Sequence, residues 1–112
     1  MSDDFPIEID VQTVQDLRQS DEEFLLLDVR QPEEYSVAKI EGSVLIPMGE
    51  ILERISELES HKDSRIVVQC HHGGRSMQVT QALRSRGFDK TQNMAGGIDA
   101  WSLQIDPEVP RY

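Results

Sequence analysis

The sequence has few of the residues that would point to a secreted or membrane protein. Its 112 residues include one cysteine, and aromatic residues make up 5% of the chain. A single cysteine forms no internal disulfide, which excludes a disulfide-stapled secreted fold. No apolar run approaches the ~20 residues of a membrane-spanning helix. The segment Met1–Asp4 is acidic and does not resemble an apolar signal sequence. We therefore expect a cytoplasmic protein with no membrane segment.

Basic residues are also scarce. The chain has 11 lysine and arginine residues against 21 aspartate and glutamate residues, for a formal net charge of −10. Without a basic surface there is no counterion release to drive nucleic-acid binding, so nucleic acid is not an expected partner. Residues 1–60 carry sixteen acidic and four basic side chains, whereas residues 61–112 carry five and seven. The second half is the less repulsive one for an anionic substrate, and the acidic half is interpreted mainly as a solvated face.

Length and composition indicate one domain. With 38% hydrophobic and 29% charged residues the composition is ordinary for a globular protein. A chain of this length buries roughly two-thirds of its unfolded surface in a single core. We expect one monomeric domain over residues 1–112, with a motif-bearing core at about residues 7–103 and an extended tail at 104–112.

The hydrophobic pattern alternates between strands and helices. Strands are predicted at 7–9, 24–29, 44–46, 66–68 and 91–94. Helices are predicted after Asp10, from Pro32, across 51–58, from Ser76 to a glycine stop at Gly87, and at 98–103. This alternation predicts an α/β fold, in which a parallel sheet of about five strands is flanked by helices. Sites in such sheets form at the C-terminal ends of strands.

Cys70 stands at such a strand end, followed by two glycines and a helix. The segment reads Cys70-His71-His72-Gly73-Gly74-Arg75-Ser76. Unpaired backbone N–H groups and the positive end of a helix dipole point at this position, which lowers a cysteine pKa from about 8.5 to about 3.5–7.5. The glycines and Arg75 favour a nucleophilic thiolate over a buried structural cysteine, because a core cysteine needs neither.

The polar side chains of the loop have alternative interpretations. Arg75 points inward to hold an anion or outward to pair with an acidic side chain, and a mixed role is favoured. Ser76 is either part of the anion-binding loop or the helix N-cap. His71 and His72 line the pocket mouth or are simply exposed. A metal site with Cys70 is not expected, because consecutive residues of a tight turn do not converge on one ion.

Three segments resemble the motifs of one family. The Cys70 loop is similar to the active-site loop of single-domain rhodaneses, which follows Cys-x-x-Gly-x-Arg-Ser/Thr. A second segment, similar to the family's Asp-Val-Arg-x-Pro-x-Glu-Tyr motif, is Leu27-Asp28-Val29-Arg30-Gln31-Pro32-Glu33-Glu34-Tyr35. A third, similar to its closing Asn-x-x-Gly-Gly-x-x-x-Trp motif, is Asn93-Met94-Ala95-Gly96-Gly97-Ile98-Asp99-Ala100-Trp101. The three motifs occur in the family's order and span nearly the whole chain.

The resemblance implies a rhodanese-like three-layer fold and a sulfurtransferase. In such an enzyme the Cys70 thiolate takes a sulfane sulfur from a small donor, such as thiosulfate, or from a protein persulfide. It holds this sulfur as a persulfide and passes it to a thiophilic acceptor such as cyanide or a thiol, with ping-pong kinetics. Backbone N–H groups from His71 to Ser76 would surround the terminal sulfur. Neither a metal nor another cofactor is implied.

The remaining motif residues are expected to be structural. Asp28 and Arg30 support the site, because a carboxylate at a strand end accepts hydrogen bonds from loop amides or an arginine. Glu34 is expected to be a helix residue and Trp101 a core residue. The turn at Gly96–Gly97 is expected to approach the Cys70 loop.

The tail segment Ile105-Asp106-Pro107-Glu108-Val109-Pro110-Arg111-Tyr112 also resembles the end of rhodanese domains fused to enzymes that activate ubiquitin-like sulfur carriers. This likeness is short. It adds a protein partner in a sulfur relay to the small-molecule donors and acceptors that the family motifs imply.

Two other functions remain open within the same fold. A phosphatase and arsenate-reductase branch has a Cys-x5-Arg loop, one residue longer than the six residues from Cys70 to Arg75. A smaller ring of N–H donors fits one sulfur atom but not three phosphoryl oxygens. Non-catalytic binding modules typically lack the cysteine that this chain has. A dithiol redox protein is excluded within one chain, because there is no resolving cysteine.

Overall fold

Five parallel strands form the central sheet of the computed structural model, which describes residues 5–112. Their bounds are β1 (Glu8–Ile9), β2 (Leu25–Asp28), β3 (Val44–Leu45), β4 (Ile66–Gln69) and β5 (Thr91–Met94). The spatial order is β1-β5-β4-β2-β3, and every neighbouring pair is parallel. The α/β fold expected from the sequence is confirmed. The acidic segment Met1–Asp4, which was not expected to be a signal sequence, lies outside the described residues.

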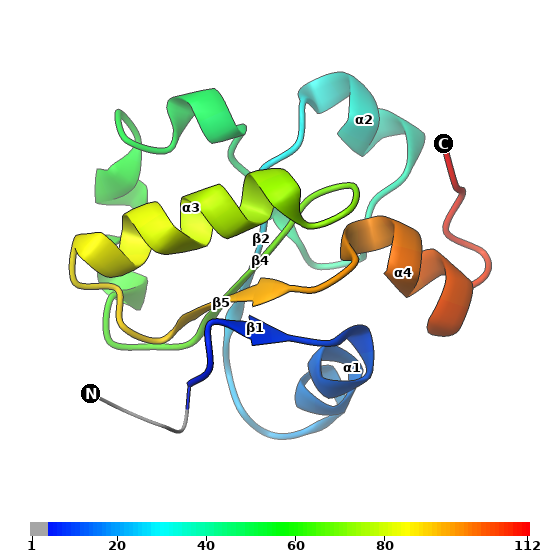
Figure 1. Cartoon of the computed structure of the whole chain (residues 1–112), viewed down its shortest axis with the longest axis horizontal. Coiled ribbons are helices and arrows are strands. Elements are labelled where there is room, and N and C mark those ends of the chain that lie inside the picture. The colour runs from blue at the N-terminus through cyan, green and yellow to red at the C-terminus, as the bar shows by residue number, and fades with distance from the viewer. Residues whose placement is uncertain (1–4) are drawn as a thin grey trace.

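Helices cover both faces of the sheet (Figure 1). They are α1 (Val11–Gln19), α2 (Pro32–Val37), α3 (Gly74–Ser85) and α4 (Gly97–Gln104). The helices α1 and α4 contact each other on one face, and α3 lies on the opposite face. Among residues 5–112, no helix is both long enough and apolar enough to cross a bilayer.

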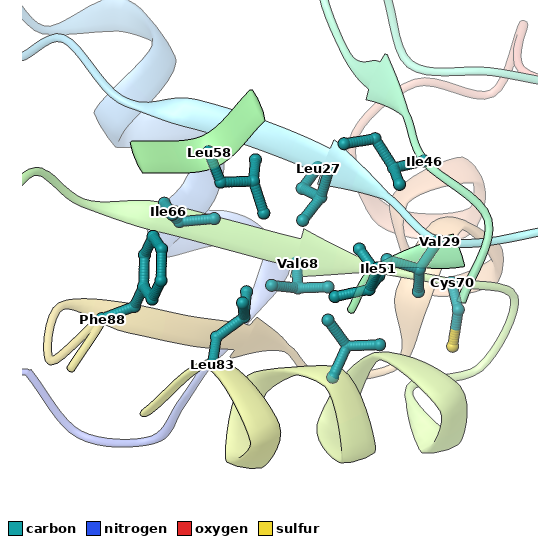
Figure 2. Packing of buried hydrophobic residues seen from close by; sticks show 11 residues of the cluster. Leu27, Val29, Ile46, Ile51, Leu58, Ile66, Val68, Cys70, Leu83 and Phe88 are labelled. Carbon is teal, nitrogen blue, oxygen red and sulfur yellow. The ribbon is translucent and has the colours of Figure 1, made fainter. Parts of the chain in front are cut away.

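Strand β4 carries Cys70 to the end of the sheet. It is buried along its whole length, and its side chains alternate between the two faces. Val68 and Cys70 belong to the hydrophobic cluster that includes residues of α3. Val67 belongs to the cluster on the face of α1 and α4. Figure 2 shows the first cluster, with the Cys70 sulfur at the end nearest the first turn of α3.

The strand register brings two of the predicted site residues together. Asp28 at the end of β2 lies opposite Gln69 at the end of β4. Cys70 directly follows Gln69, and the Val29 N–H donates to the Gln69 carbonyl just beyond the ladder. The C-terminal ends of β2 and β4 therefore form one edge, where parallel sheets place their sites.

The segment before β4 differs from the expected α-helix. The α-helix predicted across 51–58 is absent: residues 51–54 form turns between two 3-10 helices, η1 (Met48–Glu50) and η2 (Ile55–His61). Ile51 and Leu58 are buried, whereas Leu52 of the same apolar pattern is 55% exposed. Ile55 and Leu58 are three residues apart, and this spacing suits the three-residue turn of a 3-10 helix as well as an α-helix. The apolar pattern therefore could not distinguish the two.

The start of α1 and the end of α3 have their expected caps. The Asp10 carboxylate accepts a hydrogen bond from the Thr13 N–H at the start of α1 (2.8 Å). Gly87, with φ of 96°, follows the C-terminus of α3 in the left-handed region that favours glycine. The last helix, α4, runs to Gln104, one residue into the expected tail.

Candidate active site

The Cys70 sulfur lies among hydrogen-bond donors at the start of α3. Cys70 is 1% exposed. Its Sγ accepts hydrogen bonds from the backbone N–H groups of Gly73 (3.1 Å) and Ser76 (3.4 Å). The Ser76 hydroxyl lies 3.4 Å from the same atom, and its one proton is shared between Sγ and Asn93 Oδ1. The first backbone N–H groups of a helix have no acceptor within the helix, and here the Cys70 sulfur accepts their hydrogen bonds instead.

These donors favour the ionised form of the thiol. Burial of Cys70 raises its pKa, but hydrogen bonds from the Ser76 hydroxyl and from the amides of Ser76, Gly73 and His72 outweigh that effect. The net result is a Cys70 pKa below the ordinary cysteine value. Thiolate is the nucleophilic form of cysteine. The loop thus stabilises a nucleophile while keeping it out of bulk water.

The two loop glycines are not equivalent. Gly73 is the N-cap of α3 and has φ of 110°, which favours glycine. A Cβ on Gly73 would lie 3.4 Å from the Gly96 nitrogen. Gly74 has no positive φ, and a Cβ there would meet open space. The backbone therefore requires glycine at position 73 but not at position 74.

Ser76 lies within α3 and does not cap it. The cap position belongs to Gly73, so the alternative of Ser76 as N-cap is wrong. The buried Ser76 hydroxyl is instead placed between the Cys70 sulfur and Asn93, whose Oδ1 accepts from it. Asn93 is oriented by its own donation to Glu8 Oε2 (2.8 Å). Asn93 and Glu8 therefore hold the Ser76 hydroxyl in place beside the Cys70 thiol.

Arg75 points outward to an acidic side chain. Its guanidinium donates two hydrogen bonds to the Glu34 carboxylate, at 2.7 and 2.9 Å. This bidentate pair links the loop to α2. The Arg75 contacts, with those of Gln31 and Tyr112, lower the Glu34 pKa to about 2, against the opposing effect of burial. Of the two orientations considered for Arg75, the structure has the outward one.

Asp28 and Arg30 form a buried ion pair at the end of β2. Both side chains are fully buried, with Arg30 Nη2 2.6 Å from Asp28 Oδ2. The Arg30 backbone N–H and Nε also donate to Asp28 Oδ1, at 3.0 and 2.9 Å. The remaining guanidinium hydrogens reach the carbonyls of Ala38 and Glu34 and the Tyr112 hydroxyl. The pair thus joins the end of β2 to α2, and its role in supporting the site stays a prediction.

His71 and His72 form the rim of the loop. Their rings stack with centroids 4.0 Å apart, and His71 also stacks on Tyr112 at 4.0 Å. Burial lowers the His71 pKa, and the neighbouring His72 adds to this effect, whereas the His72 side chain is 67% exposed. With Asp99 they bring three ligand atoms within 4.8 Å of one another, although Asp99 already pairs with Arg111. These three residues are one fewer than the four ligands of a structural zinc site. The absence of a metal here stays a prediction.

The N-terminus of α4 supports the loop from the other side. The Ile98 N–H donates to the Cys70 carbonyl (2.8 Å), and the Asp99 N–H donates to the His71 carbonyl (3.1 Å). A Cβ on Gly97 would clash with both carbonyls. The expected approach of the Gly96–Gly97 turn to the Cys70 loop is confirmed, and this contact requires glycine at position 97.

A family model matches this arrangement over most of the chain. The rhodanese-like domain model covers residues 10–104. The chain belongs to the rhodanese-like domain family. The resemblance of its three motifs to rhodaneses is thereby confirmed, together with the three-layer fold.

Similar rhodanese-like proteins include short and long chains. YtwF of Bacillus subtilis, which is named as a candidate sulfurtransferase, is 39% identical over 101 residues, or 90% of this chain and 95% of YtwF. The adenylyltransferase and sulfurtransferase MOCS3-1 of Zea mays is 35% identical over 96 residues, or 81% of this chain. The human single-domain sulfurtransferase TSTD1 superposes with a TM-score of 0.77 at 25% identity, covering 88% of this chain and 97% of TSTD1. This chain spans between 20% and 31% of the length of the plant relatives that it matches.

Sequence reasoning missed two residues of this rhodanese-like site. Glu34 was expected to be a helix residue, yet it holds Arg75 of the loop. Tyr112 was placed only in an extended tail, yet its ring covers His71 and its hydroxyl contacts both Arg30 and Glu34. The sequence contained one indication of Glu34, because a loop arginine such as Arg75 needs an acidic partner. It did not indicate which of the many acidic residues is that partner.

Proposed function

We propose that this chain is a sulfurtransferase in which Cys70 carries the transferred sulfur as a persulfide. The observation that carries the proposal is the buried Sγ with hydrogen bonds from Gly73 and Ser76 and a lowered pKa. A persulfide places a negative charge one bond further out, and backbone N–H groups from His71 to Ser76 would surround it. The names of the maize, Bacillus and human relatives support sulfur chemistry.

In the first half-reaction the Cys70 thiolate attacks the outer sulfur of a donor such as thiosulfate. A bond forms between Sγ and that sulfur, the donor's S–S bond breaks, and its electron pair leaves with sulfite. Sulfite leaves with the two negative charges of thiosulfate, and the negative charge of the thiolate moves to the terminal sulfur of the persulfide. Cys70 acts as a covalent carrier, which divides the transfer into two displacements.

In the second half-reaction an acceptor attacks the terminal sulfur. The bond from Sγ to that sulfur breaks, and its electron pair returns to Cys70 as thiolate. Cyanide becomes thiocyanate, whereas a thiolate becomes a persulfide. Sulfur moves as a neutral atom in both steps, so no external oxidant or reductant is needed.

The surrounding residues would position the loop. Glu34 holds Arg75 so that the guanidinium contributes positive charge at the loop rim without lying on the sulfur. The Asp28–Arg30 pair fixes the end of β2 beside the loop. We infer supporting roles for these residues, and a substrate-contacting role for His71 and His72 at the rim.

The natural donor and acceptor are proposed as classes. Small sulfane donors with thiophilic acceptors suit the buried thiol, and cytoplasmic thiols would serve as acceptors. The likeness to the maize sulfurtransferase, and to a Bacillus subtilis protein named as a candidate sulfur carrier, also supports a protein relay partner. The chain acting as a monomer remains a proposal.

Loop length argues against phosphoryl transfer. Six residues run from Cys70 to Arg75, and the ring of donors closes on one sulfur atom. A phosphoryl group would need space for three equatorial oxygens in line with the attacking sulfur. We therefore expect no appreciable hydrolysis of aryl phosphates.

Steady-state kinetics with thiosulfate and cyanide test the proposal. We expect parallel double-reciprocal lines, sulfite release at the rate of thiocyanate formation, and no turnover by Cys70→Ser. Turnover that persists in Cys70→Ser would refute the proposed carrier. Robust aryl phosphate hydrolysis that depends on Cys70 would replace sulfur transfer with the phosphatase alternative.

A further inference from the structure

The tail crosses α4 and ends at the rim of the Cys70 loop. Val109 is buried, and its carbonyl accepts a hydrogen bond from the Ser102 hydroxyl of α4. Arg111 pairs with Asp99 of α4 at 2.9 Å. With these two contacts to α4, the tail places Tyr112 beside α2, where Figure 1 marks the C-terminus.

The Tyr112 side chain has three partners from different parts of the site. Its ring lies nearly parallel to the His71 ring, with centroids 4.0 Å apart and 10° between planes. Its hydroxyl donates to Glu34 Oε2 (2.8 Å) and accepts from Arg30 Nη1 (2.9 Å). The hydroxyl can fill both roles at once because a phenol has one proton and free lone pairs.

These contacts connect Tyr112 to both ends of the loop. His71 is the first residue after Cys70, and Glu34 holds Arg75 at the far end of the loop. Tyr112 is nevertheless 42% exposed, so it is anchored on one side and faces solvent on the other. The Tyr112 ring thus lies against the residue that follows Cys70, and the Cys70 thiol itself is almost fully buried.

We propose that Tyr112 is a specificity-determining residue, whose ring forms one wall of the mouth above Cys70 and selects small, unbranched reactants over bulky ones. Donor and acceptor reach the same sulfur in turn, so the wall acts on both half-reactions. The part of this proposal that concerns acceptors rests on the proposed sulfur transfer. The part that concerns access to the thiol does not.

Alkylation of Cys70 tests the wall without any sulfur transfer. Cys70 is the only cysteine, so every thiol label reports on this site. We compare the rates of iodoacetamide and of fluorescein maleimide, a small and a bulky reagent, on the wild type, Tyr112→Ala and Tyr112→Phe. Leu103→Ala is the matched control, because Leu103 is an exposed apolar residue of α4.

We expect Tyr112→Ala to raise the ratio of the bulky reagent's rate to the small reagent's rate by about tenfold. This is the low end of the discrimination that a pocket achieves between substrates differing by one methylene group. Tyr112→Phe should keep the wild-type ratio because the stacked ring remains, and Leu103→Ala should also leave it unchanged. An unchanged ratio in Tyr112→Ala would overturn the proposal. A Tyr112→Phe variant that behaves like Tyr112→Ala would also overturn it, since the hydroxyl rather than the ring would then select. Matching unfolding midpoints show that each variant is folded.

The same variants are then assayed for transfer to cyanide and to glutathione. We expect Tyr112→Ala to raise kcat/KM for glutathione relative to kcat/KM for cyanide. If the alkylation ratio changes but the wild type transfers no sulfur, the proposed function fails while the wall remains. If sulfur transfer occurs but neither ratio responds to Tyr112→Ala, the wall fails while the function remains.

Discussion

The ion pair between Arg75 and Glu34 should contribute stability that depends on pH. The Glu34 pKa falls from 4.5 to about 2, chiefly through the two hydrogen bonds from Arg75. A shift of that size corresponds to about 3 kcal/mol, at about 1.4 kcal/mol per pKa unit. The Arg75 and Glu34 side chains are 35% and 20% exposed. Solvent screening therefore reduces the expected coupling energy to about 1–2 kcal/mol at pH 7.

A double-mutant cycle measures this coupling by urea unfolding. It uses Glu34→Gln, Arg75→Met and the double variant. The folded pKa of Glu34 is depressed, so its stabilisation is complete above the unfolded value of 4.5 and is lost as the pH falls through about 2. We expect full coupling at pH 7 and little at pH 2. The exposed pair Arg54–Glu57 is the control and should couple more weakly. A pH-independent coupling, or one below about 0.3 kcal/mol at pH 7, would refute this reasoning.

Three further predictions concern residues around the thiol. Ser76→Ala should raise the pH midpoint of Cys70 alkylation by iodoacetamide, because a hydrogen bond to the thiolate is lost; an unchanged midpoint would contradict the assigned contact. Gly97→Ala should destabilise the fold by at least about 2 kcal/mol in urea unfolding, whereas Gly49→Ala, where a Cβ meets open space, should not. Equal effects of the two would disprove the close approach. Arg30→Leu should cost about 3–5 kcal/mol in the same assay, because it leaves a buried carboxylate unpaired; a loss below about 1 kcal/mol would argue against that burial.

The sheet and the position of Cys70 could be predicted because local patterns determine them. The β-branched run before Cys70 has the composition of a buried strand, and Gly87 marks the end of α3. Asp10 likewise begins α1. Where the apolar spacing suits two helix types, as across Ile55 and Leu58, the sequence predicted the wrong helix, although Leu58 is buried.

Long-range partners in the site could not be predicted. Glu34 lies 41 residues before Arg75, and Tyr112 lies 78 residues after Glu34. Many acidic residues were equally available to Arg75, because spacing along the chain carries no information on which one the fold brings near. The tail was expected to be extended, but stacking on His71 depends on how Val109 and Arg111 attach it to α4.

Mass spectrometry of the intact chain after exposure to thiosulfate tests the central claim most directly. The account predicts that the wild type gains the mass of one sulfur atom on Cys70, and that cyanide removes it. Cys70→Ser should gain nothing under the same conditions. The account would be contradicted if the wild type gained no sulfur from thiosulfate or a protein persulfide, or if the adduct survived in Cys70→Ser.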